Sequence, residues 1–340
     1  MASTFSEFQK LGFNLTEKEL LAAEKIVMAE YTAAVQSIGL QLQKQYAKLA
    51  GVSPENYYNE MLKFGRLKYM LKQVHDDYVK HSLAAGRTIS ASLKKAMSDN
   101  YYRQQFTTSW AAVPAKYTVL PESLIELSVL GTEDTFKAVT DAVKKKFGES
   151  VLYQPKAGSL SALLADNRTA EVKKIQKAIT SGLINGKGYA ETVKDIKNIC
   201  GVVKNGKITG GKANAMRILR TESTRILNSA AFANGKQLEA QGVDVYKQWV
   251  ATLDSSTRDR HQALDGQKRA MDETFDQDGD HAMYPGEFGS VAMNVNCRCT
   301  HNEIIPGLEP DIRIGRDPVT GKNAVFGYKN YPEWKKNNFK

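Results

Sequence analysis

The chain has 340 residues, of which 42% are hydrophobic and 25% are charged, and this composition is ordinary for a folded protein of two or three domains. No apolar run approaches the roughly 20 residues that cross a bilayer, and the first residues lack the basic segment and apolar core of a secretory signal. Three cysteines are too few for a disulfide framework. We therefore expect a soluble protein made in a reducing cytoplasm, with no membrane partner.

The formal net charge of +10 is unevenly distributed along the chain. Residues 161–250 carry 15 basic and 7 acidic side chains, whereas residues 251–309 carry 5 basic and 11 acidic ones. Basic proteins attract polyanions, and nucleic acid is the commonest such partner. The basic region therefore predicts contact with DNA through six side chains, which are Lys173, Lys174, Lys204, Lys207, Lys212 and Arg217. A solvated, charge-rich helical surface is the alternative.

The first third of the chain has helical patterns, and we expect a helical N-terminal domain over residues 1–112. Thr16 and Glu19 have the spacing of a capping box, which predicts that the first helix begins there. Apolar residues then recur at helical spacing. Ser53–Pro54 predicts the start of a second helix, because serine is a good N-cap and proline suits the first helical position. A third helix is expected over 89–105.

Residues 113–160 are expected to form a linker that carries one helix near Glu133–Phe147. Residues 161–242 follow as a basic helical region. Two helices should be separated at Gly186–Gly188, and a long helix should end at Gly242.

The glycine-rich segment before that long helix has a partial match to a phosphate-binding loop. Gly206, Gly211 and Lys212 satisfy the glycine and lysine spacing, but alanine follows Lys212 where the loop needs a hydroxyl to hold magnesium. A flexible loop between helices is therefore the better interpretation. On the long helix, Arg225 can reach Glu222 across one turn. The pair is either a surface pair or a buried pair that orients the next domain.

Residues 243–309 change character and are expected to form a compact α+β module. Its elements, in chain order, are a strand at 243–252, a short helix with Arg258, His261 and Leu264, a turn at Asp265–Gly266 and a closing strand at 297–306. Residues 310–340 are expected to be a basic C-terminal tail. The predicted fold class is mainly α with a small C-terminal α+β module, in which the strand carrying the cysteines closes a short sheet.

Cys297 and Cys299 stand one residue apart, and in a strand both thiols would point to the same face. With His261 nearby they predict a metal site, because zinc prefers thiolate and imidazole ligands. The fourth ligand is expected to be His301, or otherwise one of His281, Asp254 and Asp265. Two small residues buried in a core strand are the alternative explanation of the pair. A disulfide between them would be strained.

An acidic segment offers a second candidate cation site. Asp276, Asp278, Asp280 and Glu287 have the spacing of EF-hand ligands, but His281 stands where that loop needs glycine for its sharp turn. An acidic surface loop is therefore the better interpretation.

The order of the motifs in residues 165–306 resembles the phage head morphogenesis family, the minor head (minor capsid) proteins typified by protein F of phage Mu. The matching pieces are "RILRTESTRILNSAAF" on a helix, "WVATLDSSTRDRHQALDGQ" after a strand, and a closing "NCRC". The resemblance assigns a structural role to the matching positions, which are Arg220, Thr221, Glu222, Trp249, Asp254, Arg258, His261, Leu264, Asp265, Gly266, Asn296, Cys297, Arg298 and Cys299.

The resemblance implies a virion structural protein that is present in few copies at the portal vertex, inside the head. Such a protein acts in head assembly and in DNA packaging or ejection. The implied partners are the portal protein, major capsid or scaffold proteins, and double-stranded DNA, and the host cytoplasm is the implied location during assembly. No enzymatic activity is required. The alternatives are a metal-dependent nuclease, with His261 and nearby aspartates as metal ligands, and a DNA-binding protein unrelated to virions.

The sequence departs from the family at the metal-binding positions. The best-known version has cysteines at two positions of the short helix and His-Pro before the final Cys-Arg-Cys, which looks like a closed zinc site. Here Arg258 and His261 stand at the helix positions, and Asn294 stands at the histidine position. This chain thus keeps only part of that ligand set. Without a metal, we expect Arg258, His261 and Asp265 to form a hydrogen-bonded cluster that fixes the same loop.

Overall fold

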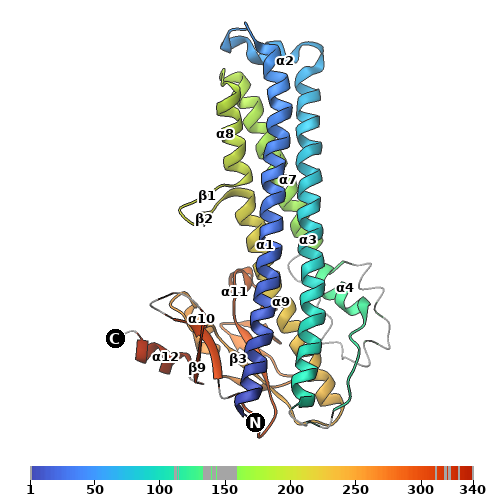
Figure 1. Ribbon diagram of the computed structural model, residues 1–340, viewed down its shortest axis with the longest axis vertical. Helices are drawn as coiled ribbons and strands as arrows, with labels where there is room; N and C mark the ends of the chain where they lie inside the picture. Colours follow the sequence, from blue (N-terminus) through green and yellow to red (C-terminus); the bar gives the residue numbers. More distant parts are fainter. Residues whose placement is uncertain are drawn as a thin grey trace. The chain divides into compact units, whose positions relative to one another are not determined.

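The protein is mainly helical, with small antiparallel sheets in its C-terminal region, as the sequence predicts (Figure 1). The computed structural model describes residues 2–110, 113, 115–132, 139, 143, 159–310, 312–317, 320, 323–327 and 330–338. No helix in these ranges is long and apolar enough to cross a membrane.

The chain divides into two compact units, each built from segments that are separated in the sequence. Unit 1 combines Met1–Leu20, Ser92–Leu160 and Arg220–Lys340, and unit 2 combines Leu21–Ala91 and Ser161–Leu219.

The two longest helices are α1 (Ala2–Tyr46) and α3 (Arg66–Trp110), each of 45 residues. The predicted helix start at Thr16 is wrong, because Thr16 lies inside α1, where its hydroxyl accepts a hydrogen bond from Arg103 of α3. The separate third helix over 89–105 is also wrong, since that segment is part of α3. A capping pattern is a local signal, and a buried tertiary contact can use the same hydroxyl inside a helix.

Short helical turns connect α1 to α3. They are η1 (Ala47–Leu49), η2 (Pro54–Asn56), α2 (Tyr57–Leu62) and η3 (Lys63–Gly65). Ser53 is the N-cap residue of η2, with Pro54 at its first position, so a helical turn begins where predicted. The long helix that follows, α3, begins only at Arg66. In unit 1, α4 (Glu122–Leu130) follows α3. The helix expected near Glu133–Phe147 lies outside the described residues apart from positions 139 and 143.

The basic region forms the helices that the sequence predicts. Helices α7 (Leu160–Ile184) and α8 (Tyr189–Cys200) are separated at the expected glycines, and α9 (Gly210–Ala240) ends just before Gly242. A small hairpin of β1 (Val203–Lys204) and β2 (Lys207–Ile208) precedes α9.

A buried carboxyl group lies among the helices of unit 2. Glu171 on α7 is 2% exposed, and its carboxylate accepts a hydrogen bond from the hydroxyl of Tyr78 on α3. The ring of Tyr78 packs edge-on against Tyr31 of α1, with ring centroids 6.3 Å apart. Burial raises the pKa of Glu171 to about 7, and it raises the pKa of the neighbouring Cys200 thiol to about 12. Unit 2 therefore favours the neutral form of this carboxyl group.

The Glu171 carboxyl should make unit 2 less stable as the pH rises. Its pKa is higher in the folded than in the unfolded chain, so its stabilising contribution is complete below the unfolded value of 4.5 and is lost as the pH rises to about 7. Above that pH the ionised carboxylate lowers the free energy of unfolding of unit 2 by on the order of 3 kcal/mol. Glu171→Gln should therefore unfold later than the wild type at pH 8 and show little gain at pH 4.5, in urea titrations of both proteins. Equal gains at both pH values would contradict this assignment.

The C-terminal module is built on a three-stranded antiparallel sheet with strand order β4-β3-β7. These strands are β4 (Lys268–Ala270), β3 (Tyr246–Val250) and β7 (Thr300–Ile304), and the register places Trp249 opposite His301. The short helix α10 (Asp259–Leu264), the hairpin of β5 (Phe275–Gln277) and β6 (Asp280–Ala282), and α11 (Val291–Asn294) complete the module. Trp249 is fully buried at the centre of its apolar core.

The closing strand is shorter than predicted. It begins at Thr300, so Cys297 and Cys299 lie in the loop that leads into β7 and not in the strand itself. Beyond the module, β8 (Ile312–Arg316) pairs with β9 (Asn323–Gly327), and α12 (Tyr331–Asn338) follows. Leu253, Tyr331 and Trp334 form a buried cluster, so the segment expected as a basic tail contributes its own core.

Candidate metal centre of the C-terminal module

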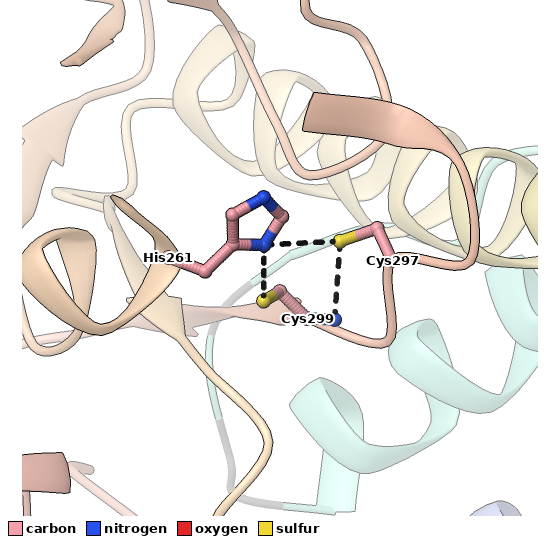
Figure 2. Close-up of side chains that lie close together, drawn as sticks. All are labelled: His261, Cys297 and Cys299. Atoms are coloured by element: carbon pink, nitrogen blue, oxygen red, sulfur yellow. Dashed lines mark hydrogen bonds between the residues drawn. The ribbon is translucent and has the colours of Figure 1, made fainter. Parts of the chain in front are cut away.

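The structure brings His261, Cys297 and Cys299 together in the module core (Figure 2). The Nδ1 atom of His261 lies 3.1 Å from the Sγ atom of Cys299 and 3.5 Å from that of Cys297. All three side chains are buried, and their ligand atoms lie within 4.8 Å of one another. This group is close enough to hold a metal ion.

Helix α9 fixes the backbone of both cysteines. The hydroxyl of Thr224 donates to the carbonyl of Cys297 at 2.5 Å, and the side-chain amide of Asn228 donates to the carbonyl of Cys299 at 3.0 Å. Both side chains come from α9, the long helix that also carries Arg220, Thr221 and Glu222, the Arg-Thr-Glu motif of the resemblance. Because these hydrogen bonds hold the backbone carbonyl groups, both thiols point toward His261.

Arg298 explains why the two cysteines are spaced by one residue. Its guanidinium pairs with the carboxylate of Asp254, and its carbonyl accepts a hydrogen bond from Thr252 at 2.8 Å. Arg298 is exposed whereas both flanking cysteines are buried. The alternation therefore places the thiols inside the module and the guanidinium on the outside.

The two thiols differ in their electrostatic surroundings. The hydrogen bond with Cys299 and the neighbouring His261 hold the pKa of Cys297 well below its usual value. Burial raises the pKa of Cys299 well above it. A thiolate is the form that binds a metal ion. Cys297 is therefore the thiol of the two that ionises more readily.

His301, the predicted fourth ligand, lies apart from this group. Its backbone N–H and its Nδ1 contact the side-chain oxygen of Asn228 at 3.0 and 3.1 Å, and its ring stacks on Tyr284. Burial, with a smaller effect of Lys247, lowers the pKa of His301 to about 3. His301 is therefore neutral and held by Asn228.

The other proposed ligands are also engaged elsewhere. His281 is exposed on β6 and contacts Asp276 at 2.5 Å. Asp254 pairs with Arg298, and Asp265 pairs with Arg313. Among the residues that the structure describes, a fourth histidine, cysteine or carboxylate ligand does not join the three.

Asp265 ties three segments together. It accepts hydrogen bonds from the backbone N–H groups of Ala251 and Tyr331, at 2.7 and 2.6 Å, and it forms a two-pronged pair with Arg313 of β8. The side chains of this pair are 0% and 1% exposed. The expected cluster of Arg258, His261 and Asp265 is wrong, because Asp265 faces Arg313 and the Arg258 guanidinium reaches the carbonyl of Val295.

Glu222 of the Arg220-Thr221-Glu222 motif forms a buried ion pair with Arg225, one turn further along α9. The Nη2 atom of Arg225 lies 2.6 Å from the carboxylate of Glu222 and 2.7 Å from the carbonyl of Ser128 on α4. The pair is buried and not on the surface. Thr221 accepts a hydrogen bond from the backbone of Asn296 at 3.0 Å, whereas Arg220 is exposed. Gly266 and Asn296, both at turns of the module, have positive φ values of 80° and 54°.

Sequence reasoning missed a buried lysine. Lys247 on β3 is fully buried, with its ammonium 4.9 Å from the ring centre of Phe232 and 3.3 Å from the carbonyl oxygen of Met271. Burial lowers its pKa to about 8. Lysine is rarely fully buried, so the residue type carried no signal for this site.

The predicted DNA-contacting residues lie on several elements of unit 2. Lys173 and Lys174 are exposed on α7, Arg217 is exposed on α9, and Lys212 donates to Thr32 of α1 at 2.9 Å. Lys204 and Lys207 are exposed on the β1–β2 hairpin.

The two rejected motifs have other structures. Gly211 lies in the first turn of α9 and not in a phosphate-binding loop. Asp276 and Asp280 lie on paired strands with Asp278 in the turn between them, which is a hairpin and not an EF-hand.

Comparison with known proteins finds that part of the chain is similar to one family. Residues 173–302 match the model of the family described as Phage Mu protein F like protein. The chain is also 26% identical to Minor head protein GP7 of Bacillus phage SPP1 over 320 residues, which are 92% of each chain. The predicted resemblance to phage minor head proteins is thereby confirmed.

A second relative has an enzyme name. It is NAD(+)--arginine ADP-ribosyltransferase EFV of Enterococcus faecalis, 33% identical over 181 residues, which are 53% of this chain. The match covers only 35% of the length of that protein. No solved structure matches the chain.

Proposed function

Since the chain carries the phage Mu protein F like module and is similar to a phage minor head protein over nearly its whole length, we propose that it acts at the portal vertex inside the head. In this role a few copies contact the portal protein and neighbouring capsid or scaffold proteins. They assist head assembly and the packaging or ejection of DNA. The observation that carries the proposal is the match over 92% of both chains, since it includes the helical segments as well as the module.

The proposed location can be tested in assembled heads. Cross-linking of purified particles, followed by mass spectrometry, should join lysines of this chain to the portal protein. Cross-links to the major capsid protein alone, spread over the shell, would contradict a position at the portal vertex.

The proposed contact with double-stranded DNA is supported by the charge of residues 161–250 and by the exposed lysines of unit 2. Contact with phosphates requires neither a base-specific surface nor catalysis.

We propose a structural role without catalysis. His261 faces two buried thiols, and the carboxylates of Asp254 and Asp265 are neutralised by arginines, so the ligand set of a metal-dependent nuclease does not converge. The enzyme-named relative extends far beyond its match with this chain. Incubation with labelled NAD⁺ and an arginine-rich acceptor protein should leave the acceptor unlabelled. Labelling of the acceptor that increases with the concentration of this protein would contradict the structural role.

We also propose that His261, Cys297 and Cys299 bind zinc. Two thiols and an imidazole form a donor set that zinc prefers, and a tetrahedral site then takes one further ligand. Bound zinc would join α10 to the loop before β7, and its role would be structural.

Purified protein should retain about one zinc per chain, because a buried thiolate pair with an imidazole holds the ion tightly. Inductively coupled plasma mass spectrometry after dialysis measures this ratio. The double variant Cys297→Ser/Cys299→Ser should lose the metal. The matched control is Cys200→Ser, which replaces a buried cysteine of unit 2 and should keep the zinc. A metal-free wild type after growth and purification in zinc would exclude the proposed site.

A further inference from the structure

The β1–β2 hairpin is an exposed basic element of unit 2. Its turn residues Asn205 and Gly206 have φ values of 50° and 72°, and positive values at both positions are the mark of the tight turn that suits paired strands. The residues from Val203 to Lys207 are all exposed. In Figure 1 the hairpin extends away from the neighbouring α8.

The hairpin places two like charges opposite each other. Lys204 and Lys207 are direct cross-strand partners, and a pair of like charges in this position destabilises a hairpin. Within the part of the chain that the structure describes, neither lysine forms an ion pair with an acidic residue. The hairpin thus has an unbalanced charge that an external polyanion would neutralise.

The stem of the hairpin is tightly fixed. Gly201 and Gly210 flank it with φ values of 111° and 60°, and a Cβ atom on them would lie 2.1 Å from the carbonyl oxygen of Thr209 and 2.5 Å from that of Ile199. The backbone N–H of Thr209 donates to the carbonyl of Val202 at 3.0 Å. These contacts hold the hairpin in one orientation, so its lysines are presented in advance of binding.

Two further lysines extend the charge along α8. Lys194 and Lys197 are exposed and three residues apart, which places them on one face of the helix. The acidic residues of α8 are already used, because Asp195 pairs with Lys187 at 2.7 Å and Glu191 accepts a hydrogen bond from the backbone N–H of the N-cap residue Gly188. Lys197 lies in the last turn of α8, just before the hairpin.

We propose that the β1–β2 hairpin, together with Lys194 and Lys197, is the surface through which the chain contacts double-stranded DNA. This inference rests on the DNA contact of the proposed function. A two-stranded ribbon fits the major groove, and flexible lysines bind phosphates as point charges without reading sequence. The lysines on the two strands of the hairpin are placed to meet phosphates on either side of the groove.

The test uses the full chain and a fluorescent 30-base-pair duplex of arbitrary sequence, with binding followed by fluorescence anisotropy across a salt series. Lys204→Glu/Lys207→Glu should weaken binding at low salt by at least about tenfold, because attraction to phosphates becomes repulsion. Lys204→Ala/Lys207→Ala should reduce the slope of log affinity against log salt by roughly 2, the value for two lost phosphate contacts. Lys194→Ala/Lys197→Ala should act in the same direction.

The matched control is Lys335→Glu/Lys336→Glu, which makes the same charge change at exposed positions of α12 in unit 1. It should bind DNA nearly as well as the wild type. A hairpin variant that binds no worse than this control would overturn the inference. If the wild type fails to bind DNA even at low salt, the proposed DNA contact itself fails. Unchanged circular dichroism of each variant separates lost contacts from lost folding.

Discussion

Replacing Asp265 with alanine should destabilise the C-terminal module by about 3–5 kcal/mol, because it leaves the guanidinium of Arg313 buried without its partner. The same change removes the acceptor for the backbone N–H groups of Ala251 and Tyr331. Hydrogen exchange measured at the β3 and α12 amides reports the loss locally, which is preferable to one global unfolding curve in a chain with two compact units.

Two further variants make this prediction specific. Asp276→Ala removes a carboxylate from the exposed face of β5. It should change the free energy of opening measured by hydrogen exchange by less than about 0.5 kcal/mol. Arg313→Ala should destabilise the module as much as Asp265→Ala does. The double variant should lose less stability than the sum of the two single losses, since the partners share one interaction. Additive effects would show that Asp265 and Arg313 do not act as a pair.

Trp249→Ala should cost the module a similar amount, about 3–5 kcal/mol, because it empties the centre of a closely packed core. Trp249 is fully buried, and its ring lies edge-on to His261 and Phe275, with centroids 6.0 and 5.2 Å away. The expected result is fast amide exchange throughout β3 and β7, together with weakened zinc retention, since the ring supports His261.

Trp249→Phe is the matched control, because it keeps an aromatic ring in the same place. It should lose no more than about half of the stability lost by Trp249→Ala. Equal losses would mean that ring volume at this site does not decide the stability of the module. If Trp249→Ala shows wild-type amide exchange in β7, Trp249 does not support the metal centre.

The sequence predicted the helices well where the periodicity was strong and their ends poorly. The glycines at 186 and 188 separate α7 from α8 as expected, because glycine interrupts a helix without help from tertiary contacts. The Thr16 signal failed because its hydroxyl is used by Arg103, a partner 87 residues away. Patterns within a few residues of each other cannot report such a contact.

Only part of the candidate site was predictable, because local patterns do not report contacts between residues far apart in the sequence. The thiol spacing and the position of His261 predicted that these three residues meet, and the structure brings them together. The choice of His301 as fourth ligand followed from its nearness in sequence, whereas strand pairing opposite Trp249 places it against Asn228. Arg313 lies 48 residues from Asp265 and outside the family motif, so no local pattern indicated that pair.

We expect this chain to be a component of the phage head. Quantitative mass spectrometry can detect it in purified, nuclease-treated particles of the phage that encodes it. The predicted result is a few copies of the chain per particle, at a small and constant ratio to the major capsid protein. Its absence from particles, with the protein found only in the lysate of infected cells, would contradict a place in the phage head.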